Sequence, residues 1–115
     1  MGCSESLSLS EVERLIKVLR LGFVKILGES NLNILEIFLR RFFKRDIYHV
    51  FLEEPKRFYE ELIKIYGDGA DFLLRALFTV LVREDLLKPL DIDEIMRLMK
   101  MDDKDFIKKL LDKLE

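Results

Sequence analysis

Hydrophobic residues recur at steps of three and four positions along most of the chain. The pattern covers residues 12–27, 34–43, 58–66, 72–81, 92–99 and 106–114. Such spacing places apolar side chains on one face of an amphipathic helix. No stretch of useful length alternates apolar and polar residues at period two, so we expect no sheet. The pattern therefore predicts an all-α protein.

Short signals mark the predicted helix ends. Capping residues are expected at Ser10 with Glu13, at Ser30 or Asn31, at Asp68, at Asp91 with Glu94, and at Asp102. Pro55 suits the first position of a helix, and Gly28 and Gly67 suit helix C-termini. Residues 46–53 are predicted to form one or two short turns. The residues expected to face inward on the two middle helices are Phe58, Leu62, Ile65, Tyr66, Phe72, Leu73, Ala76, Leu77, Val80 and Leu81.

These boundaries predict a bundle of about five to six helices in a single domain, residues 1–115. Within it we expect a bundle core at 10–84 and a C-terminal helical pair at 90–115. Half of the 115 residues are hydrophobic, which suffices for one core. Segment 34–43 is apolar around most of its circumference, which is typical of a helix that lies centrally in the core or is covered by a partner.

Composition excludes several classes of function. The net charge of −2, from 20 basic and 22 acidic residues, gives no general attraction to nucleic acid or to an anionic membrane. No apolar run is long enough to span a bilayer, and the N-terminus does not resemble a secretory signal. A single cysteine, Cys3, favours a reducing compartment, so we expect a cytoplasmic protein. The lack of Gln and the many charged residues resemble thermophile proteins.

The N-terminal residues Met1-Gly2-Cys3-x-x-Ser6 fit a short acylation pattern. In a eukaryotic chain this pattern would indicate a lipid anchor. Because the composition indicates a thermophilic prokaryote, we expect no acylation.

Candidate catalytic groups are few. His49 is the one histidine, and with Glu53 it offers two metal ligands at i, i+4, which is too few for a zinc site. The acidic run 102–105 lacks the glycine and distal glutamate of a calcium loop. The turn 67–69 lacks the strand, third glycine and lysine of a phosphate loop. We therefore expect no enzyme activity, no cofactor and no metal.

Two segments suggest nucleic acid. Arg40, Arg41, Lys44 and Arg45 flank two phenylalanines and could bind phosphates, although cations also favour a helix C-terminus. Residues 91–115 have the spacing of a helix-turn-helix and resemble that half of winged-helix regulators. Asp102, Asp103 and Asp105, however, start the would-be recognition helix and would repel a phosphate backbone. Packing or dimerisation is therefore favoured over DNA reading for this tail.

The middle of the chain supplies a family resemblance. Residues 53–58, Glu-Glu-Pro-Lys-Arg-Phe, lead to Leu62, to the segment 65–70, Ile-Tyr-Gly-Asp-Gly-Ala, and then to an apolar helix. From about Val18 to Glu84 this resembles the Nitrosopumilus output domain family of small archaeal helical bundles. The resemblance implies an archaeal helical bundle without established biochemistry, and it supplies no site residues.

The sequence thus predicts a non-enzymatic protein-interaction or regulatory module that self-associates as a homodimer. Surplus apolar surface is expected at Phe38, Phe42, Phe43, Met96 and Met99, and near Leu7 and Leu9. Two alternatives stay open. One is a DNA-binding regulator that uses the tail, and the other is a small-ligand-binding domain with a polar pocket near His49.

Overall fold

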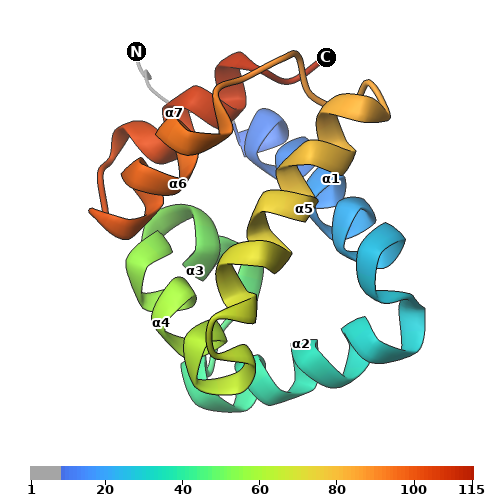
Figure 1. Ribbon diagram of the computed structural model, residues 1–115, viewed down its shortest axis with the longest axis vertical. Helices are drawn as coiled ribbons and strands as arrows, with labels where there is room; N and C mark the ends of the chain where they lie inside the picture. Colours follow the sequence, from blue (N-terminus) through green and yellow to red (C-terminus); the bar gives the residue numbers. More distant parts are fainter. Residues whose placement is uncertain (1–8) are drawn as a thin grey trace.

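Seven helices and no strand make up residues 9–115, the part of the chain that the computed structural model describes (Figure 1). They are α1 (Leu9–Leu27), α2 (Glu29–Phe43), α3 (Ile47–Glu53), α4 (Pro55–Tyr66), α5 (Gly69–Arg83), α6 (Ile92–Lys100) and α7 (Asp105–Asp112). The predicted all-α class is confirmed. The added helix is α3, where the sequence pattern predicted one or two short turns.

The longest helix, α1, packs along α5, and the two approach most closely at Gly22. A Cβ atom at this position would lie 2.7 Å from Leu77 Cδ1 and 2.8 Å from Leu81 Cδ2. Both leucines are fully buried. The contact between α1 and α5 therefore depends on a residue without a side chain.

Phenylalanine rings from four helices meet around Phe51 in α3. The ring centroid of Phe51 lies 4.4 Å from that of Phe58 in α4, 5.5 Å from that of Phe106 in α7 and 6.4 Å from that of Phe23 in α1. All four rings are at most 1% exposed. The short helix α3 is thus held at the centre of the core, between elements far apart in sequence.

The expected caps of the first two helices are wrong. Helix α2 begins at Glu29, after Gly28 at φ 85°, and the Asn31 side chain donates to the Leu27 carbonyl at 3.0 Å. Glycine adopts this positive φ without steric cost, so the chain turns at Gly28, two to three residues before the expected Ser30 or Asn31 cap. Helix α1 already includes Leu9 and Ser10, so Ser10 does not occupy a cap position.

Other helix ends follow the sequence signals. Asp91 accepts a hydrogen bond from the Glu94 amide at 3.2 Å, and Pro55 opens α4, which ends before Gly67. Asp46 accepts from the His49 amide at 3.1 Å and caps α3. Asp68 precedes α5 but makes no side-chain cap bond.

Asp102 caps a different helix from the one expected. Helix α7 starts only at Asp105, whose amide donates to Asp103 Oδ1 at 2.9 Å. Asp102, at φ 56°, instead accepts a hydrogen bond from the Lys56 amide at 3.2 Å, in the first turn of α4. Glu54, the residue at the α4 cap position, makes no side-chain cap bond. The turn between α6 and α7 therefore supplies the missing acceptor to α4.

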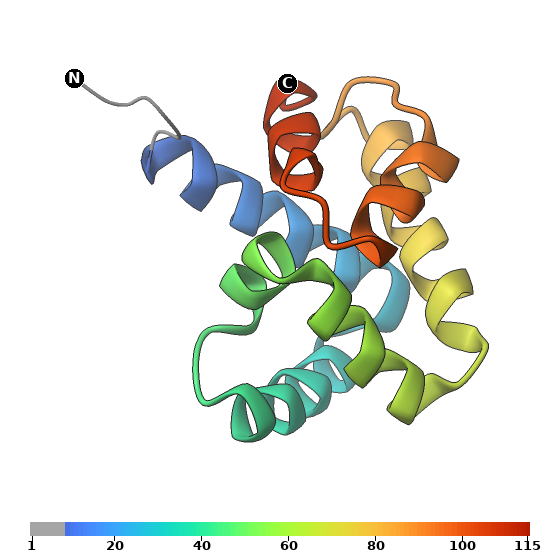
Figure 2. The ribbon, with the colours of Figure 1, turned by 90° about the vertical axis from the view of Figure 1, so that its left-hand side faces the viewer.

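The C-terminal pair, α6 and α7, packs on α4, α5, α1 and α3 (Figure 2). An isolated bridge joins Leu87 to Leu114, and the Lys88 amide donates to the Lys113 carbonyl at 2.7 Å. Arg14 in α1 donates to the Glu115 carbonyl at 2.6 Å. These bonds hold the end of the chain against the loop after α5 and against the first helix.

Candidate functional site

The outer side of α2 carries the main exposed apolar surface. This helix lies at the lower edge of the fold in both ribbon views (Figure 1, Figure 2), and it buries Leu32, Leu35, Leu39 and Phe43. On the opposite side the exposed fractions are 65% for Ile34, 53% for Ile37, 58% for Phe38 and 46% for Phe42. The apolar residues of segment 34–43 thus fall on two sides of the helix. One side packs in the core, and the other faces solvent.

The end of α4 continues this surface. Ile63, Ile65 and Tyr66 are each nearly two-fifths exposed. Ile65 and Tyr66 line a depression of about 320 Å³ together with Ile34 and Phe38 of α2. Ile63 lines a neighbouring depression with Phe42. We call the seven residues Ile34, Ile37, Phe38, Phe42, Ile63, Ile65 and Tyr66 the α2 face.

Charged groups border the α2 face. Lys64 Nζ lies 5.3 Å from the centroid of the Phe42 ring, and the guanidinium of Arg57 lies 6.0 Å from it. Cations at these distances from a ring are attracted to its π system. Lys64 also forms an ion pair with the buried Glu61 at 2.8 Å. Phe42 is therefore held in place at the edge of the face although it is half exposed.

The structure corrects part of the expected interface. Phe43, Met96 and Met99 are at most 6% exposed and belong to the core of this chain, so they are not available to a partner. Phe38 and Phe42 lie on the α2 face as exposed residues. Leu9 is 70% exposed at the start of α1, whereas Leu7 lies outside the described residues.

Three aromatic and aliphatic residues expected in the core are exposed. Phe72 is 79% exposed because the buried stripe of α5 runs through Leu74, Leu77, Phe78 and Leu81, about 200° around the helix from it. Ile65 and Tyr66 are exposed because the buried positions of α4, Phe58 and Leu62, lie nearer its start. Helical spacing identifies an apolar stripe but does not show where along it the neighbouring helix ends.

The four basic residues expected to form a nucleic-acid patch are not all free of carboxylate partners. Arg45 donates to Glu53 at 2.6 Å and to Glu54 at 3.1 Å, and the hydrogen bond that Glu53 accepts raises the pKa of the Arg45 guanidinium. Arg40, Arg41 and Lys44 have exposed side chains around the end of α2. Since two carboxylates already neutralise Arg45, the nucleic-acid patch predicted from the sequence retains three cations.

The helix-turn-helix geometry expected for α6 and α7 is not confirmed. Phe106 and Leu110 of α7 are fully buried, and Lys109 lies 3.6 Å from Glu94 of α6. Asp102 and Asp103 hold the turn, as described above, and Asp105 is exposed at the start of α7. DNA reading by this pair stays the alternative that the sequence disfavours.

A polar cluster centred on the buried Glu36, which the sequence pattern did not predict, joins the first three helices. Glu36 of α2 is 9% exposed, and its Oε2 accepts from Tyr48 Oη of α3 at 2.5 Å and from Arg20 Nε of α1 at 3.0 Å. Arg20 also donates to Glu29 at 3.2 Å. The one sequence signal is Glu36 itself, a carboxylate inside an otherwise apolar run. The cluster positions α2 so that its other side faces outward.

Tyr48→Phe is expected to change the response of stability to alkaline pH. Burial, together with the hydrogen bond to Glu36, raises the pKa of Tyr48 above its ordinary value of 10.0. Above about pH 10 the unfolded chain loses this proton while the folded chain keeps it, so the free energy of unfolding falls by up to about 1.4 kcal/mol per pH unit. Below about pH 10, Tyr48 makes its full contribution to the free energy of unfolding.

Urea unfolding of the wild type and of Tyr48→Phe at pH 8, 10 and 11 measures this effect. At pH 8 the variant is expected to be less stable by about 1–3 kcal/mol, because Glu36 loses a donor. The gap between the two proteins should narrow as the pH rises above 10. A gap that stays constant to pH 11 would show that Tyr48 titrates alike in both states.

A second polar cluster joins α4, α5 and α6. Asp71 accepts hydrogen bonds from Tyr59 Oη and from Lys100 Nζ, the latter at 2.7 Å. Burial alone would raise the pKa of Asp71, but the hydrogen bonds from Lys100 and Tyr59 outweigh it and lower the pKa. Lys100 Nζ also lies 5.3 Å from the centroid of the Tyr59 ring. Tyr59, Asp71 and Lys100 each have a partner within the cluster, so the cluster stabilises the contact between the three helices.

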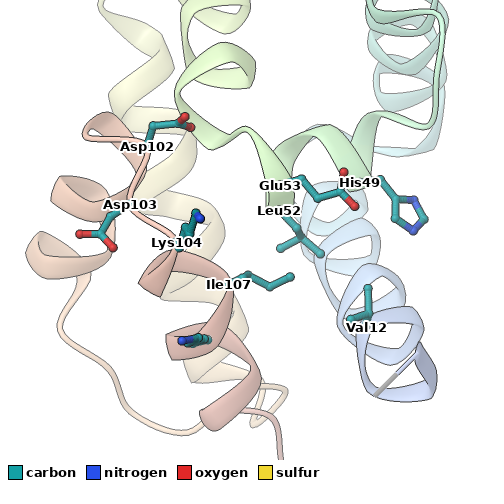
Figure 3. Close-up of a pocket in the computed structure, with 9 residues that line it drawn as sticks. Val12, His49, Leu52, Glu53, Asp102, Asp103, Lys104 and Ile107 are labelled. Carbon is teal, nitrogen blue, oxygen red and sulfur yellow. The ribbon is translucent and has the colours of Figure 1, made fainter. Parts of the chain in front are cut away.

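A cavity of about 350 Å³ lies between α1, α3 and α7 (Figure 3). Val12, Leu52 and Ile107 reach into the same space from the three helices. His49, Glu53, Asp102, Asp103, Lys104 and Lys108 complete the lining. We expected a polar pocket near His49, whereas the floor of this cavity is apolar and its polar groups lie at the rim.

Possible metal ligands do not cluster in residues 9–115. His49 Nδ1 lies 2.6 Å from Asp46, and within this range no three His, Cys, Asp or Glu side chains form a possible metal site. Cys3 and the Met1-Gly2-Cys3 pattern lie outside the described residues. Within the described chain, no helix has both the length and the apolar character that crossing a membrane requires.

Residues 9–115 fold as a small all-α domain that carries the exposed α2 face and the cavity between α1, α3 and α7. Comparisons with family models, with curated proteins and with solved structures find nothing that matches this chain. The resemblance of residues 18–84 to the Nitrosopumilus output domain family therefore stays a prediction from the sequence.

Proposed function

We propose that this protein is a non-enzymatic interaction module that pairs with a second copy of itself through the α2 face. The observation that carries the proposal is the exposure of Ile34, Ile37, Phe38 and Phe42 on one side of α2. Exposed apolar residues scattered singly are ordinary on a protein surface, whereas a contiguous patch of this kind marks an interaction site.

The area of the face is adequate for a weak dimer. From the exposed fractions of its seven residues, the face offers roughly 600 Å² per copy. Two copies would bury about 1,200 Å², which is the lower end of specific interfaces. We therefore expect a dissociation constant in the micromolar range.

The spacing of the face suits a twofold arrangement. Ile34 and Phe42 lie four residues before and after Phe38 along α2. If two α2 helices pair antiparallel about Phe38, Ile34 of each copy meets Phe42 of the other, as a twofold interface requires. The same pairing brings the acidic start of α2, at Glu29, towards its basic end, at Arg41 and Lys44. Opposite charges and opposed helix dipoles then favour association.

Sedimentation velocity at protein concentrations from roughly 5 to 500 µM tests the proposal, because a micromolar dimer forms over this range. The wild type is expected to shift from monomer to dimer. Phe38→Glu places two carboxylates at the centre of the interface and should weaken association by at least about 100-fold. Because Phe38 is 58% exposed, the monomer should keep its circular dichroism spectrum and melting temperature.

Met101→Glu is the matched control. Met101 is 62% exposed in the turn between α6 and α7, so it undergoes the same change of character outside the α2 face. This variant should dimerise as the wild type does. A wild type that stays monomeric at the highest concentration, or equal weakening by both variants, would overturn the proposal.

A further inference from the structure

We propose that two copies of this protein recognise each other by exchanging the ring of Phe42, which each copy inserts into the depression between α2 and α4 of the other. This contact rests on the proposed pairing through the α2 face. Phe42 is then the anchor of the dimer, and the depression is the site that receives it.

The lining of the depression suits an uncharged apolar occupant. Aliphatic and aromatic side chains form most of it, and Asn31 and Tyr66 are its polar members. None of these side chains is charged at neutral pH, and the Asn31 amide already donates to the Leu27 carbonyl at 3.0 Å. The depression measures about 320 Å³. Since a cavity of roughly 150 Å³ can hold benzene, it has room for one phenyl ring.

The ring of Phe42 is held ready in the single chain. It is 46% exposed, and its centroid lies 5.2 Å from that of the buried Phe43 ring, which it meets edge-on. Lys64 and Arg57 lie near the same ring. A side chain that is already held loses less conformational freedom on association, so its burial contributes more to affinity. Aromatic residues that fill a pocket are typical hot spots of interfaces.

The twofold pairing brings the ring and the depression together. Ile34 and Asn31 line the depression one and two turns before Phe38, whereas Phe42 lies one turn after it. An antiparallel arrangement about Phe38 therefore places Phe42 of one copy against the depression of the other. Because the symmetry repeats this contact, each copy gives one ring and receives one.

Two variants that are each defective, and that complement each other, test the exchange. Phe42→Ala removes the ring and leaves the depression open, whereas Asn31→Trp keeps the ring and fills the depression. Each variant alone loses both contacts, so its dimer should be about 100-fold weaker than that of the wild type.

An equimolar mixture of the two variants restores one contact of the two. Phe42 of the Asn31→Trp chain can enter the open depression of the Phe42→Ala chain. If the two contacts contribute equally and independently, the mixed dimer should be about tenfold tighter than the dimer of either variant alone. Sedimentation velocity at roughly 20 to 500 µM, on each variant and on the mixture, measures the difference.

Thr79→Trp and Phe72→Ala are the matched controls. Thr79 is exposed on α5, and its side chain donates to the backbone carbonyl four residues earlier, as that of Asn31 does. Phe72 is a ring on α5 that is 79% exposed and lies outside the α2 face. Each control should dimerise within about twofold of the wild type. The circular dichroism spectrum and melting temperature of every variant report whether it folds.

The outcomes separate this contact from the dimer itself. If the wild type dimerises but the mixture associates no more tightly than its components, the exchange of rings is wrong and pairing through the α2 face stands. Equal weakening by Phe42→Ala and Phe72→Ala would also contradict the exchange. A wild type that stays monomeric removes the pairing and this contact with it.

Discussion

Phe51→Ala is expected to destabilise the protein by about 3–5 kcal/mol, the usual cost of removing a large buried ring. Phe51 is fully buried, and its ring contacts Phe58, Phe106 and Phe23. The substitution removes one member of each ring pair and leaves a cavity where α1, α3, α4 and α7 meet. The melting temperature should fall by roughly 10–20 °C.

Thermal and urea unfolding, followed by circular dichroism, measure this loss. Phe72→Ala is the control, because Phe72 is 79% exposed and its removal should change stability by no more than about 0.5 kcal/mol. If both variants lost the same stability, the placement of Phe51 at the centre of the core would be wrong.

Gly22→Ala is expected to destabilise the protein by about 1–3 kcal/mol, although alanine favours a helix by about 1 kcal/mol over glycine. The new methyl group would lie 2.7 Å from Leu77 and 2.8 Å from Leu81. Both leucines are fully buried, so their methyl groups can give way only by displacing other atoms of the core. Either these side chains shift, or helices α1 and α5 move apart.

Gly69→Ala is the matched control within a helix. A Cβ atom at Gly69 would meet Tyr66 Cβ at 3.7 Å, which is ordinary van der Waals contact. This change should be neutral or stabilising by up to about 1 kcal/mol. The two substitutions are thus expected to have opposite signs in the same urea experiment. A stabilising Gly22→Ala would mean that α1 and α5 are not in close contact.

Local signals in the sequence predicted the helical class and several helix ends. Pro55, Gly67 and Asp91 act as expected, because a fixed φ, a left-handed terminus and a side-chain cap depend on neighbours within one turn. The expected caps at Ser30 or Asn31 and at Asp102 are wrong. Before α2 the chain turns earlier, at Gly28. The carboxylate of Asp102 accepts its hydrogen bond from the Lys56 amide, which belongs to α4 and not to α7.

The candidate sites were only partly predictable. The excess of apolar residues in segment 34–43 indicated a surface that needs a cover, and Phe38 and Phe42 lie on it. Met96 and Met99 were expected there too but are buried. The sequence could not show this, because the amphipathic pattern of α6 is the same whether the helix packs on its own chain or on a partner. The cavity beside α7 has no sequence signal, because its three apolar residues lie far apart along the chain.

By itself, the sequence determined that this protein is an all-α domain with one histidine and one cysteine. Periodicity, capping residues and the count of His and Cys are properties that the chain carries locally. Only the tertiary structure decided which side of α2 faces solvent, and the reason lies in contacts between helices. Arg20 and Tyr48 hold Glu36 inward, so that Ile34, Phe38 and Phe42 point outward.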